Sequence, residues 1–454
     1  MAADPAPAAT RRLAAFATET AWGDIPPNVQ ADSVRSFLNF VGCALGGARH
    51  DAVERTLAAV APFAGGPEVT LIGRAAMLGA PDAALVNCQA SAANAYDDTH
   101  LATVLHPAGP IAAPLLAEAE RDTVDGPAFL AAFSIGVEIA CRLAAVLTVP
   151  PAEAHVGWYM TGVACPIGAA AAVARLRGLD MAGTMHAIGI AASQSAGFRQ
   201  SHGSMCTSLV PGLGARAGYM AALLAESGVT CSDASLEGPR GFADVFAPKA
   251  HIAHATDDLG ERWELSQNMA KPYPCGIVIH PTLDACLEIA RTPGFHAADI
   301  ETVELGVNPL CLTLCDRPSP PDGQLAQVSL QHWAAAALAR GAAGVPESTD
   351  AAVADPAILA VRAKIEARPN ETVGRDGAFV RVRRRGHPPI DMRIDHGVGS
   401  LENPMSDADL DAKFLIQAET VLAPAGAAAA LALCRDMPNL KDAAAVAHAT
   451  RAAA

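Results

Sequence analysis

The chain of 454 residues is long enough for a large buried core and two domains. Its formal net charge of −15 argues against nucleic acid or an anionic membrane surface as the main partner, so an anionic ligand would need a local cationic pocket. Hydrophobic residues make up 51% of the chain but aromatic residues only 4%, which predicts closely packed helices rich in Ala, Leu, Val and Gly.

The cysteines and the N-terminal segment bear on the cellular compartment. The chain has eleven cysteines and no C-x-x-C pair, and this usage is typical of reduced thiols. No compact apolar segment follows Arg11 and Arg12, so no export signal is visible and we expect a cytoplasmic protein. The longest uncharged run, residues 156–174, is interrupted by glycines and Pro166, and we expect it to be buried within the protein.

Helical spacing of apolar residues dominates the N-terminal half of the chain. Prolines near several helix starts and glycines in the breaks fit the usual helix boundaries. A short extended segment is expected at 69–73. The expected helices, which form antiparallel hairpins around one core, cover residues 31–46, 51–63, 81–94, 107–121, 127–147, 161–176, 181–193 and 213–227.

The pattern changes near residue 270. Residues 300–307, 378–383 and 390–394 alternate between apolar and polar side chains, which predicts strands with one apolar and one basic face, the last two joined by a turn at 386–389. A capping-box spacing, Ser406-x-x-Asp409, then opens another helical region. We therefore expect an all-helical domain at 1–268, to which 400–454 returns, and an α+β lid domain at 269–399.

A polar cluster, Tyr96-Asp97-Asp98-Thr99-His100 followed by His106-Pro107, interrupts this apolar sequence. Buried charges must be paired or hydrogen-bonded, so the cluster indicates a cavity lining or a closed network. Alternatively, Asp97 or Asp98 caps the helix that begins near Pro107 and His100 is exposed. A metal site is a third interpretation, but no second ligand cluster with recognised metal spacing is evident, and we predict no metal site.

Three further stretches concentrate polar side chains: 199–208, 271–284 and 329–333. Their Arg, Lys and His residues are the donors that a polycarboxylate needs, and the guanidinium of Arg matches a carboxylate bidentately. Each of these residues taken alone is better explained by surface solvation or local capping. Together, and next to prolines that restrict the backbone, they indicate a site.

An ordered set of short motifs carries a family resemblance. In this order they resemble the MmgE/PrpD family over nearly the whole chain. The motifs are Asn87-Cys88, Asp97-Asp98-Thr99, His106-Pro107, Thr161-Gly162, Gly168-Ala169-Ala170-Ala171, Gly178-Leu179-Asp180, Ala221-Ala222-Leu223-Leu224-Ala225, Gly228, Lys271-Pro272-Tyr273-Pro274, His280, Asp284-Ala285, Ser329-Leu330, Asn403-Pro404 and Lys413-Phe414.

The resemblance implies a large helical-hairpin domain with an α+β lid, a homodimer, no metal or organic cofactor, and a site at the domain junction. Members include 2-methylcitrate dehydratase, cis-aconitate decarboxylase and iminodisuccinate epimerase, which act on small polycarboxylates. The family's active-site histidine before proline corresponds to His106, its motif lysine to Lys271, and the following motif histidine to His280.

The chain departs from the dehydratase and decarboxylase pattern at four positions. Ala95 stands where those enzymes have an aspartate, Tyr159 where they have a histidine, Thr207 where they have a lysine, and His332 where they have a tyrosine. These changes put the dehydratase and decarboxylase assignments in doubt. A general acid/base pair is left intact.

The chemistry that fits is removal of a proton next to a carboxylate of a small di- or tricarboxylate. His106 is the expected base, with Lys271 and Arg199 holding carboxylates and Tyr159 or His332 as the second acid. We expect the substrate also to contact Asp98, Thr99, His100, His202, Thr207 and His280. The competing outcomes are a dehydratase-like lyase, an epimerase-like isomerase, and an inactive carboxylate-binding dimer.

Overall fold

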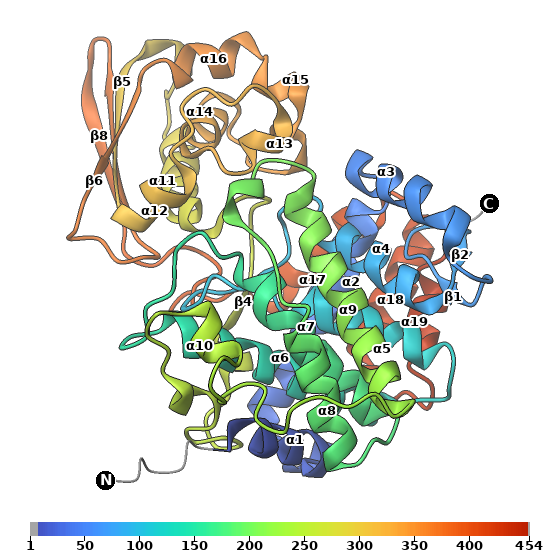
Figure 1. The fold of residues 1–454 in the computed structure, drawn as a ribbon. Coiled ribbons are helices and arrows are strands. Elements are labelled where there is room, and N and C mark those ends of the chain that lie inside the picture. Colours follow the sequence, from blue (N-terminus) through green and yellow to red (C-terminus); the bar gives the residue numbers. More distant parts are fainter. Residues whose placement is uncertain (1–7, 453–454) are drawn as a thin grey trace, which may run out of the picture.

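The computed structural model describes residues 8–452, which form a large helical domain and a smaller α+β domain (Figure 1). Each domain has its own hydrophobic core. The first core contains residues from 9–265 and 405–447, and the second contains residues from 275–382. The predicted fold class, mainly α with a smaller α+β domain, is confirmed; the exact boundaries at 268 and 399 stay a prediction.

The helical domain consists of antiparallel helices packed around the first core. The small strands β1 (Val69–Thr70) and β2 (Met77–Leu78) form a short ladder at its edge. The helices are α1 (Ala9–Glu19), α2 (Pro27–Gly47), α3 (Asp51–Val60), α4 (Ala80–Ala92), α5 (Ala108–Ala119), α6 (Gly126–Thr148), α7 (Met160–Leu176), α8 (Met181–Ala192), α9 (Cys206–Glu226) and α10 (Phe242–Phe246).

The helices predicted between residues 31 and 193 are confirmed to within a few residues, whereas the prediction for 213–227 is wrong at its start. Helix α9 begins at Cys206 and contains Pro211 in its second turn. The sequence pattern did not predict α1 or α10. Among the described residues only α6 is long and apolar enough to cross a membrane, and its most apolar stretch is entirely buried inside the protein.

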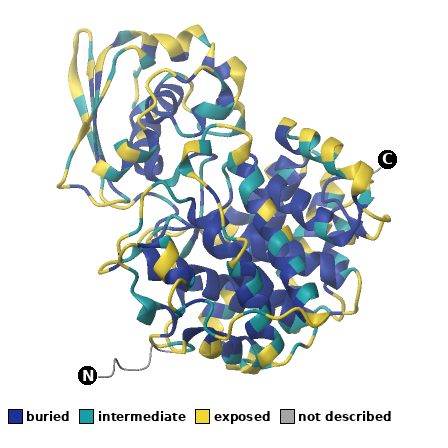
Figure 2. Cartoon of the chain, in the orientation of Figure 1, coloured by how far each residue is buried: buried dark blue, intermediate teal, exposed yellow. Residues whose placement is uncertain are grey.

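Close helix packing explains the scarcity of aromatic residues. Helix α7 packs against α6, α8 and α9, and the centre of the domain is buried throughout (Figure 2). A Cβ atom added to Gly168 on α7 would lie 2.3 Å from the carbonyl oxygen of Gly136 on α6. The two backbones therefore approach at a distance that only glycine allows.

The α+β domain contains one four-stranded sheet with the order β6-β5-β7-β8. Strands β5 and β6 are parallel, and the other two pairs are antiparallel. The elements are α11 (His280–Ala290), β5 (Ile300–Val307), α12 (Pro309–Cys315), α13 (Gly323–Ala326), α14 (Leu330–Arg340), α15 (Asp350–Val353), α16 (Pro356–Arg362), β6 (Ile365–Pro369), β7 (Ala378–Arg384) and β8 (His387–Ile394).

The sheet has the two faces that its sequence alternation predicts. Val303 and Val380 lie on the face that packs in the second core, against which α11 is placed. On the other face Arg383 pairs with Glu304 at 3.4 Å, and Arg381 pairs with Asp391 at 2.6 Å. Strand β6 was not predicted, because the alternation in Ile365–Pro369 covers only four residues before a proline ends it.

The C-terminal segment returns to the helical domain. Helix α17 (Asp407–Ala418) packs against α2 and is followed by α18 (Pro424–Arg435) and α19 (Ala444–Ala449) (Figure 1). Ser406 and Asp409 form the predicted capping box at the start of α17. This return places Lys413 on α17 next to the segment that carries Asp97.

Candidate active site

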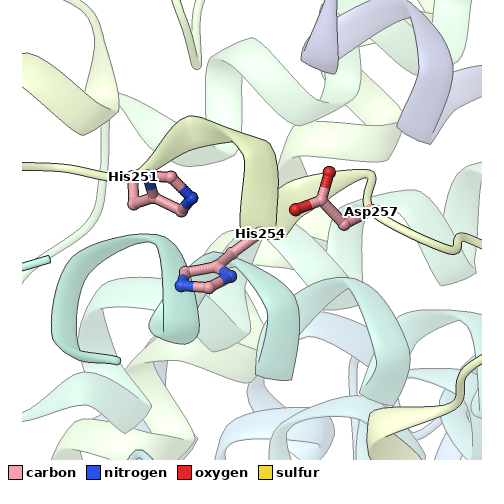
Figure 3. Close-up of side chains that lie close together, drawn as sticks. All are labelled: His251, His254 and Asp257. Atoms are coloured by element: carbon pink, nitrogen blue, oxygen red, sulfur yellow. The ribbon is translucent and has the colours of Figure 1, made fainter. Parts of the chain in front are cut away.

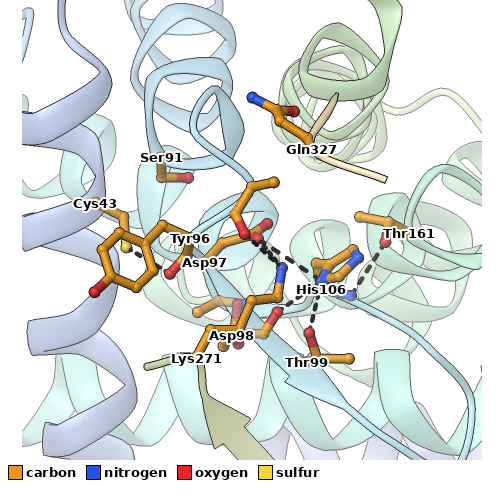
Figure 4. Close-up of polar contacts among 12 residues, drawn as sticks. Cys43, Ser91, Tyr96, Asp97, Asp98, Thr99, His106, Thr161, Lys271 and Gln327 are labelled. Carbon is orange, nitrogen blue, oxygen red and sulfur yellow. Dashed lines mark hydrogen bonds and ion pairs between the residues drawn. The ribbon is translucent and has the colours of Figure 1, made fainter. Parts of the chain in front are cut away.

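A short antiparallel ladder joins the polar cluster to the connection between the domains. Strand β3 (Asp98–His100) pairs with β4 (Asn268–Ala270), with Asp98 opposite Ala270. One residue further along, this register places Lys271 opposite Asp97. The Lys271 Nζ donates to Asp97 Oδ1 at 2.8 Å and to the Ala95 carbonyl oxygen at 3.1 Å (Figure 4). The chain segments of the two domains are thus fixed to each other by a buried ion pair.

Asp97 and Asp98 have different surroundings because neighbouring side chains of an extended segment point to opposite sides. Burial raises the pKa of Asp97, but the charge of Lys271 and its hydrogen bond outweigh burial, so the net pKa lies below its ordinary value. Burial and the nearby Asp97 raise the pKa of Asp98 to about 7. One carboxyl group is therefore ionised at neutral pH, and the other is close to half protonated.

His106 is held in one tautomer by the backbone. Its Nδ1 lies 2.6 Å from the carbonyl oxygen of Asp98 and 3.1 Å from the Thr99 hydroxyl (Figure 4). A carbonyl oxygen only accepts hydrogen bonds, so Nδ1 carries the proton and Nε2 carries the lone pair. Burial lowers the pKa of His106 to about 4, which keeps the imidazole neutral at physiological pH.

An inner cavity of about 70 Å³ lies at the junction of the two domains, beside His106. Six of the side chains predicted for the site line it: His106, Tyr159, Arg199, His202, Thr207 and Lys271. Its other lining residues are Ala92, Ala95, Asp97, Val104, Cys275, Gly276, Ile277, Val278, Leu314, Cys315, Gln327 and Val328. Acidic, basic and apolar groups from both domains thus meet in one enclosed space.

Positive charge exceeds negative charge in this cavity. Lys271 is paired with Asp97, the one carboxylate of the lining. Arg199 donates from Nε to the Trp158 carbonyl oxygen at 3.1 Å, and no ion pair joins it to a carboxylate among residues 8–452. Burial lowers the pKa of Arg199, because it disfavours the charged guanidinium. An anion bound beside Arg199 would compensate this charge.

Tyr159 and His202 form the aromatic side of the cavity. Their rings lie edge to face, 4.6 Å apart, and the Tyr159 ring lies 6.2 Å from the His106 ring. Burial and the charge of Asp97 raise the pKa of Tyr159, so its hydroxyl is neutral and able to donate a proton. Burial and the charge of Arg199 lower the pKa of His202 to about 3.

The loop that carries His202 is fixed by its own hydrogen bonds and by the second domain. The Thr207 hydroxyl accepts from the Gly203 N–H and donates to the Ser201 carbonyl oxygen. Gly203 has a φ of +82°, and a Cβ atom there would lie 2.1 Å from Leu325. The loop therefore contacts the α+β domain at a position where glycine is required.

Two non-glycine residues of the cavity wall have a left-handed backbone. Ala95 has a φ of 51° and Val104 a φ of 54°, and this conformation is most costly for a β-branched side chain. Ala95 precedes Asp97 by two residues, and Val104 precedes His106 by two residues. Such strain persists where the surrounding structure imposes it, which is common at functional sites.

Five predicted site residues do not line the inner cavity. Asp98 points to the opposite side, where its Oδ2 accepts from the Ala108 N–H at 3.0 Å, so it caps α5 as one alternative interpretation proposed. Thr99 lies behind His106 and contacts its Nδ1. The remaining three are His100, His280 and His332.

These three histidines are buried in other surroundings, which corrects the roles assigned to them. His100 lies between Thr103 at 2.8 Å and Glu264 at 3.1 Å, so the alternative that it is exposed is also wrong. His280 begins α11 and packs edge to face on a tyrosine ring. His332 donates to the Glu347 carbonyl oxygen at 2.7 Å within the α+β domain, so Tyr159 is the one remaining candidate for the second acid.

Two polar residues of the cavity wall, Asp97 and Gln327, were not among the predicted site residues. Asp97 was part of the polar cluster, but sequence alone does not show which of two adjacent aspartates faces the cavity. Gln327, which donates to the Ala93 carbonyl oxygen at 2.9 Å, had no motif around it. The strand pairing that places Asp98 opposite Ala270 also places Asp97 opposite Lys271. Knowledge of this pairing would have identified Asp97 as the residue that faces the cavity.

Two groups of possible metal ligands lie outside the cavity lining and were missed by the motif search. His251, His254 and Asp257 project from one 3₁₀ turn and the residues that flank it, with ligand atoms within 4.8 Å of one another (Figure 3). The second group is Asp376, His396 and Glu402, where His396 already pairs with Asp376 at 2.7 Å. Neither group contacts the residues that surround His106.

A buried lysine on α17, Lys413, holds the backbone around the site through hydrogen bonds. Lys413 Nζ donates to Asn39 Oδ1 at 2.7 Å and to the carbonyl oxygens of Tyr96 and Lys271 at 2.8 Å each. It also lies 4.0 Å from the centre of the Tyr96 ring, a cation–π contact. Lys413 therefore fixes the backbone next to both members of the Asp97–Lys271 pair.

The fold and the cavity together define an acid–base and cation site at the junction of a helical and an α+β domain. The model of the MmgE/PrpD N-terminal domain matches residues 11–255, and that of the MmgE/PrpD C-terminal domain matches residues 273–437. The chain belongs to the MmgE/PrpD family, as its motifs predicted.

The chain is also similar to curated proteins of known name. It is 27% identical to a cis-aconitate decarboxylase-like protein of Aspergillus oryzae, over 64% of this chain and 63% of that protein. It is 27% identical to cis-aconitate decarboxylase of Aspergillus terreus, over 62% of this chain and 60% of that protein. The match to the cis-aconitate decarboxylase of Homo sapiens has 26% identity over 79% and 77% of the two chains. The matched region thus spans less than two thirds of the fungal proteins.

Replacing Lys413 with Met should destabilise the fold by about 3 kcal/mol or more, because three buried acceptors each lose a hydrogen bond. Urea unfolding followed by circular dichroism measures the change. The exposed Lys441→Met is the matched control and should shift the free energy of unfolding by less than about 0.5 kcal/mol. Equal stability of the two variants would contradict the supporting role of Lys413.

Asp98 should make the protein less stable as the pH rises. Its pKa is raised to about 7 in the folded protein from 3.8, so between these values the folded state holds a proton that the unfolded state has lost. The free energy of unfolding from this group falls with rising pH in that window, by at most about 1.4 kcal/mol per pH unit.

Asp98→Asn removes this titration, so the variant should gain stability relative to the wild type between pH 5 and pH 8. Urea unfolding at both pH values measures the gain, with the exposed Asp233→Asn as control. If the free energy of unfolding changes with pH equally in Asp98→Asn and the wild type, Asp98 is ionised over the whole range from pH 5 to pH 8.

Proposed function

We propose that this protein is an acid/base enzyme that removes a proton next to a carboxylate of a small di- or tricarboxylate, with a lyase as the first candidate. The observation that carries the proposal is the inner cavity, where the free Nε2 of His106 faces the same space as Lys271 and Arg199. A base and two cations are the groups that such a reaction needs.

The electrostatics of the inner cavity support an anionic substrate. The protein as a whole has a net charge of −15, but the cavity has two cations and one carboxylate. Arg199 matches a carboxylate in shape, and the third N–H of Lys271 is free after its bonds to Asp97 and Ala95. One carboxylate of the substrate would thus lie between Lys271 and Arg199.

The proton-transfer step follows from this placement. His106 Nε2 takes the proton from the carbon next to the bound carboxylate, and the electron pair of the C–H bond moves into that carboxylate to form an enediolate. Lys271 and Arg199 stabilise the added negative charge. The same negative charge raises the pKa of His106 above its value in the empty site, so the imidazole becomes a stronger base when substrate binds.

The fate of the intermediate separates the two enzymatic candidates. In a lyase the electron pair expels a leaving group from the next carbon and an alkene forms. In an isomerase the carbon is reprotonated from its other face, and Tyr159, which also lines the cavity, is the proposed donor of that proton. The relatives named cis-aconitate decarboxylase favour the lyase. Tyr159 stands where the decarboxylases have a histidine, and this difference supports the isomerase as the second candidate.

Arg199→Gln should weaken the binding of succinate by about tenfold or more, since a hydrogen bond to a charged group contributes about 1.5–3 kcal/mol. Isothermal titration calorimetry measures the affinity. Arg383→Gln is the matched control, because Arg383 pairs with Glu304 on the exposed face of the sheet. Equal affinities in the two variants would show that the anion binds elsewhere.

His106→Gln should slow turnover of an identified substrate by about a hundredfold or more, the usual contribution of a positioned base. The wild-type kcat/KM should fall as the pH drops towards about 4, where His106 of the free enzyme becomes protonated. The exposed His387→Gln serves as control. Near wild-type turnover by folded His106→Gln would show that His106 is not the base.

Incubation of the substrate in D2O distinguishes the two candidates, with NMR spectroscopy as the measurement. A lyase should produce alkene signals, whereas an isomerase should introduce deuterium at the carbon next to the carboxylate without any alkene. Binding without either change, in the wild-type protein, would support the inactive carboxylate-binding protein instead.

A further inference from the structure

A second space, the outer cleft, continues from the inner cavity towards solvent. It has a volume of about 630 Å³ and shares Arg199, His202 and Leu314 with the inner cavity. The two spaces therefore adjoin at these three side chains. A cleft of this size is typical of a ligand-binding pocket.

One wall of the outer cleft is an apolar shelf formed by Val156, Trp158 and Phe198. The rings of Trp158 and Phe198 are stacked, with centroids 5.6 Å apart, and their segments are joined by an antiparallel bridge. Trp158 is anchored from behind by Phe246 at 5.0 Å. Phe198 is 62% exposed and Val156 is 58% exposed, so the shelf offers apolar surface that the described part of the protein leaves uncovered.

The opposite wall comes from the α+β domain. Thr313 and Leu314 on α12 and the following Arg317 face the shelf across the cleft. No carboxylate lies among the described residues that line the cleft, in contrast to the acidic character of the whole chain. An anionic ligand with an apolar extension thus meets no repelling group on its way to the inner cavity.

The inner cavity alone is small. Its volume of about 70 Å³ accommodates roughly five water-sized groups. A dicarboxylate that is bound by Lys271 and Arg199 fills this space, and any substituent on it must extend between Arg199 and Leu314 into the outer cleft.

We propose that the outer cleft binds an apolar substituent of the substrate, so that the preferred substrate is a polycarboxylate with an alkyl or aryl branch rather than an unbranched one. The carboxylate lies in the inner cavity, and the branch lies on Phe198 and Trp158. Burial of the branch and of the exposed shelf supplies the added affinity. This inference rests on the proposed function of the inner cavity.

Titration calorimetry with succinate and 2-hexylsuccinate tests the inference on the full-length protein. The wild type should bind 2-hexylsuccinate about tenfold or more tightly than succinate. Phe198→Ser should abolish this preference while leaving the affinity for succinate within about twofold, because the change adds no charge beside Arg199. Phe63→Ser is the matched control, because Phe63 is 87% exposed and lies outside the cleft, and it should keep the preference.

The outcomes separate the inference from the proposed function. Equal affinity of the wild type for both ligands, or a preference that survives in Phe198→Ser, would overturn the inference and leave the proposed function standing. No binding of either ligand by the wild type would overturn both. Sedimentation velocity adds one further outcome: if Phe198→Ser converts a dimer into a monomer, the shelf is a subunit contact and the inference is wrong.

Discussion

The buried ion pair between Asp97 and Lys271 is the interaction on which the rest of the site depends. Two charges are taken out of water here, and that cost is offset only if both groups find close partners. Lys271 has the Asp97 carboxylate and the Ala95 carbonyl oxygen, and the backbone beside each residue is held by Lys413. The pair also joins a segment of the helical domain to the chain that leads into the α+β domain, so the cavity and the domain junction are built by the same contact.

The alternation of side chains around β3 determines how the site is charged. Asp97 faces the inner cavity and partly neutralises Lys271, whereas Asp98 faces away and is held near half protonation by burial and by Asp97. The backbone carbonyl of Asp98 then accepts the Nδ1 proton of His106. A single extended segment therefore supplies the partner of the cation and the orientation of the base. Without that alternation both carboxylates would face the cavity and repel an anionic substrate.

Much of this arrangement was predictable from the sequence, because local patterns carry it. Apolar spacing predicted the long helices, strand alternation predicted β5, β7 and β8, and the order of short motifs indicated the family. Five of the six predicted side chains that line the inner cavity, among them His106 and Lys271, stood out as polar groups in an apolar chain, and Tyr159 was named through the family resemblance. The order of the motifs does not show that these side chains come together from both domains.

The remaining features depend on contacts between distant segments. His332 lies in a motif that marks the family, but its ring is directed to Glu347 in the core of the α+β domain. Asp98 was chosen over Asp97 because adjacent residues look alike in sequence, and only the pairing of β3 with β4 distinguishes their sides. The outer cleft combines Phe198 with α12, more than a hundred residues later in the sequence. Periodicity within a segment gives no information about such combinations.

The most direct test of the central claim is a crystal structure of the protein with succinate. The account predicts one carboxylate of succinate within about 3.2 Å of Lys271 Nζ and of the Arg199 guanidinium, with a methylene carbon facing His106 Nε2. Succinate bound only outside the inner cavity, or a His106 whose Nε2 is engaged by a protein group, would contradict the account.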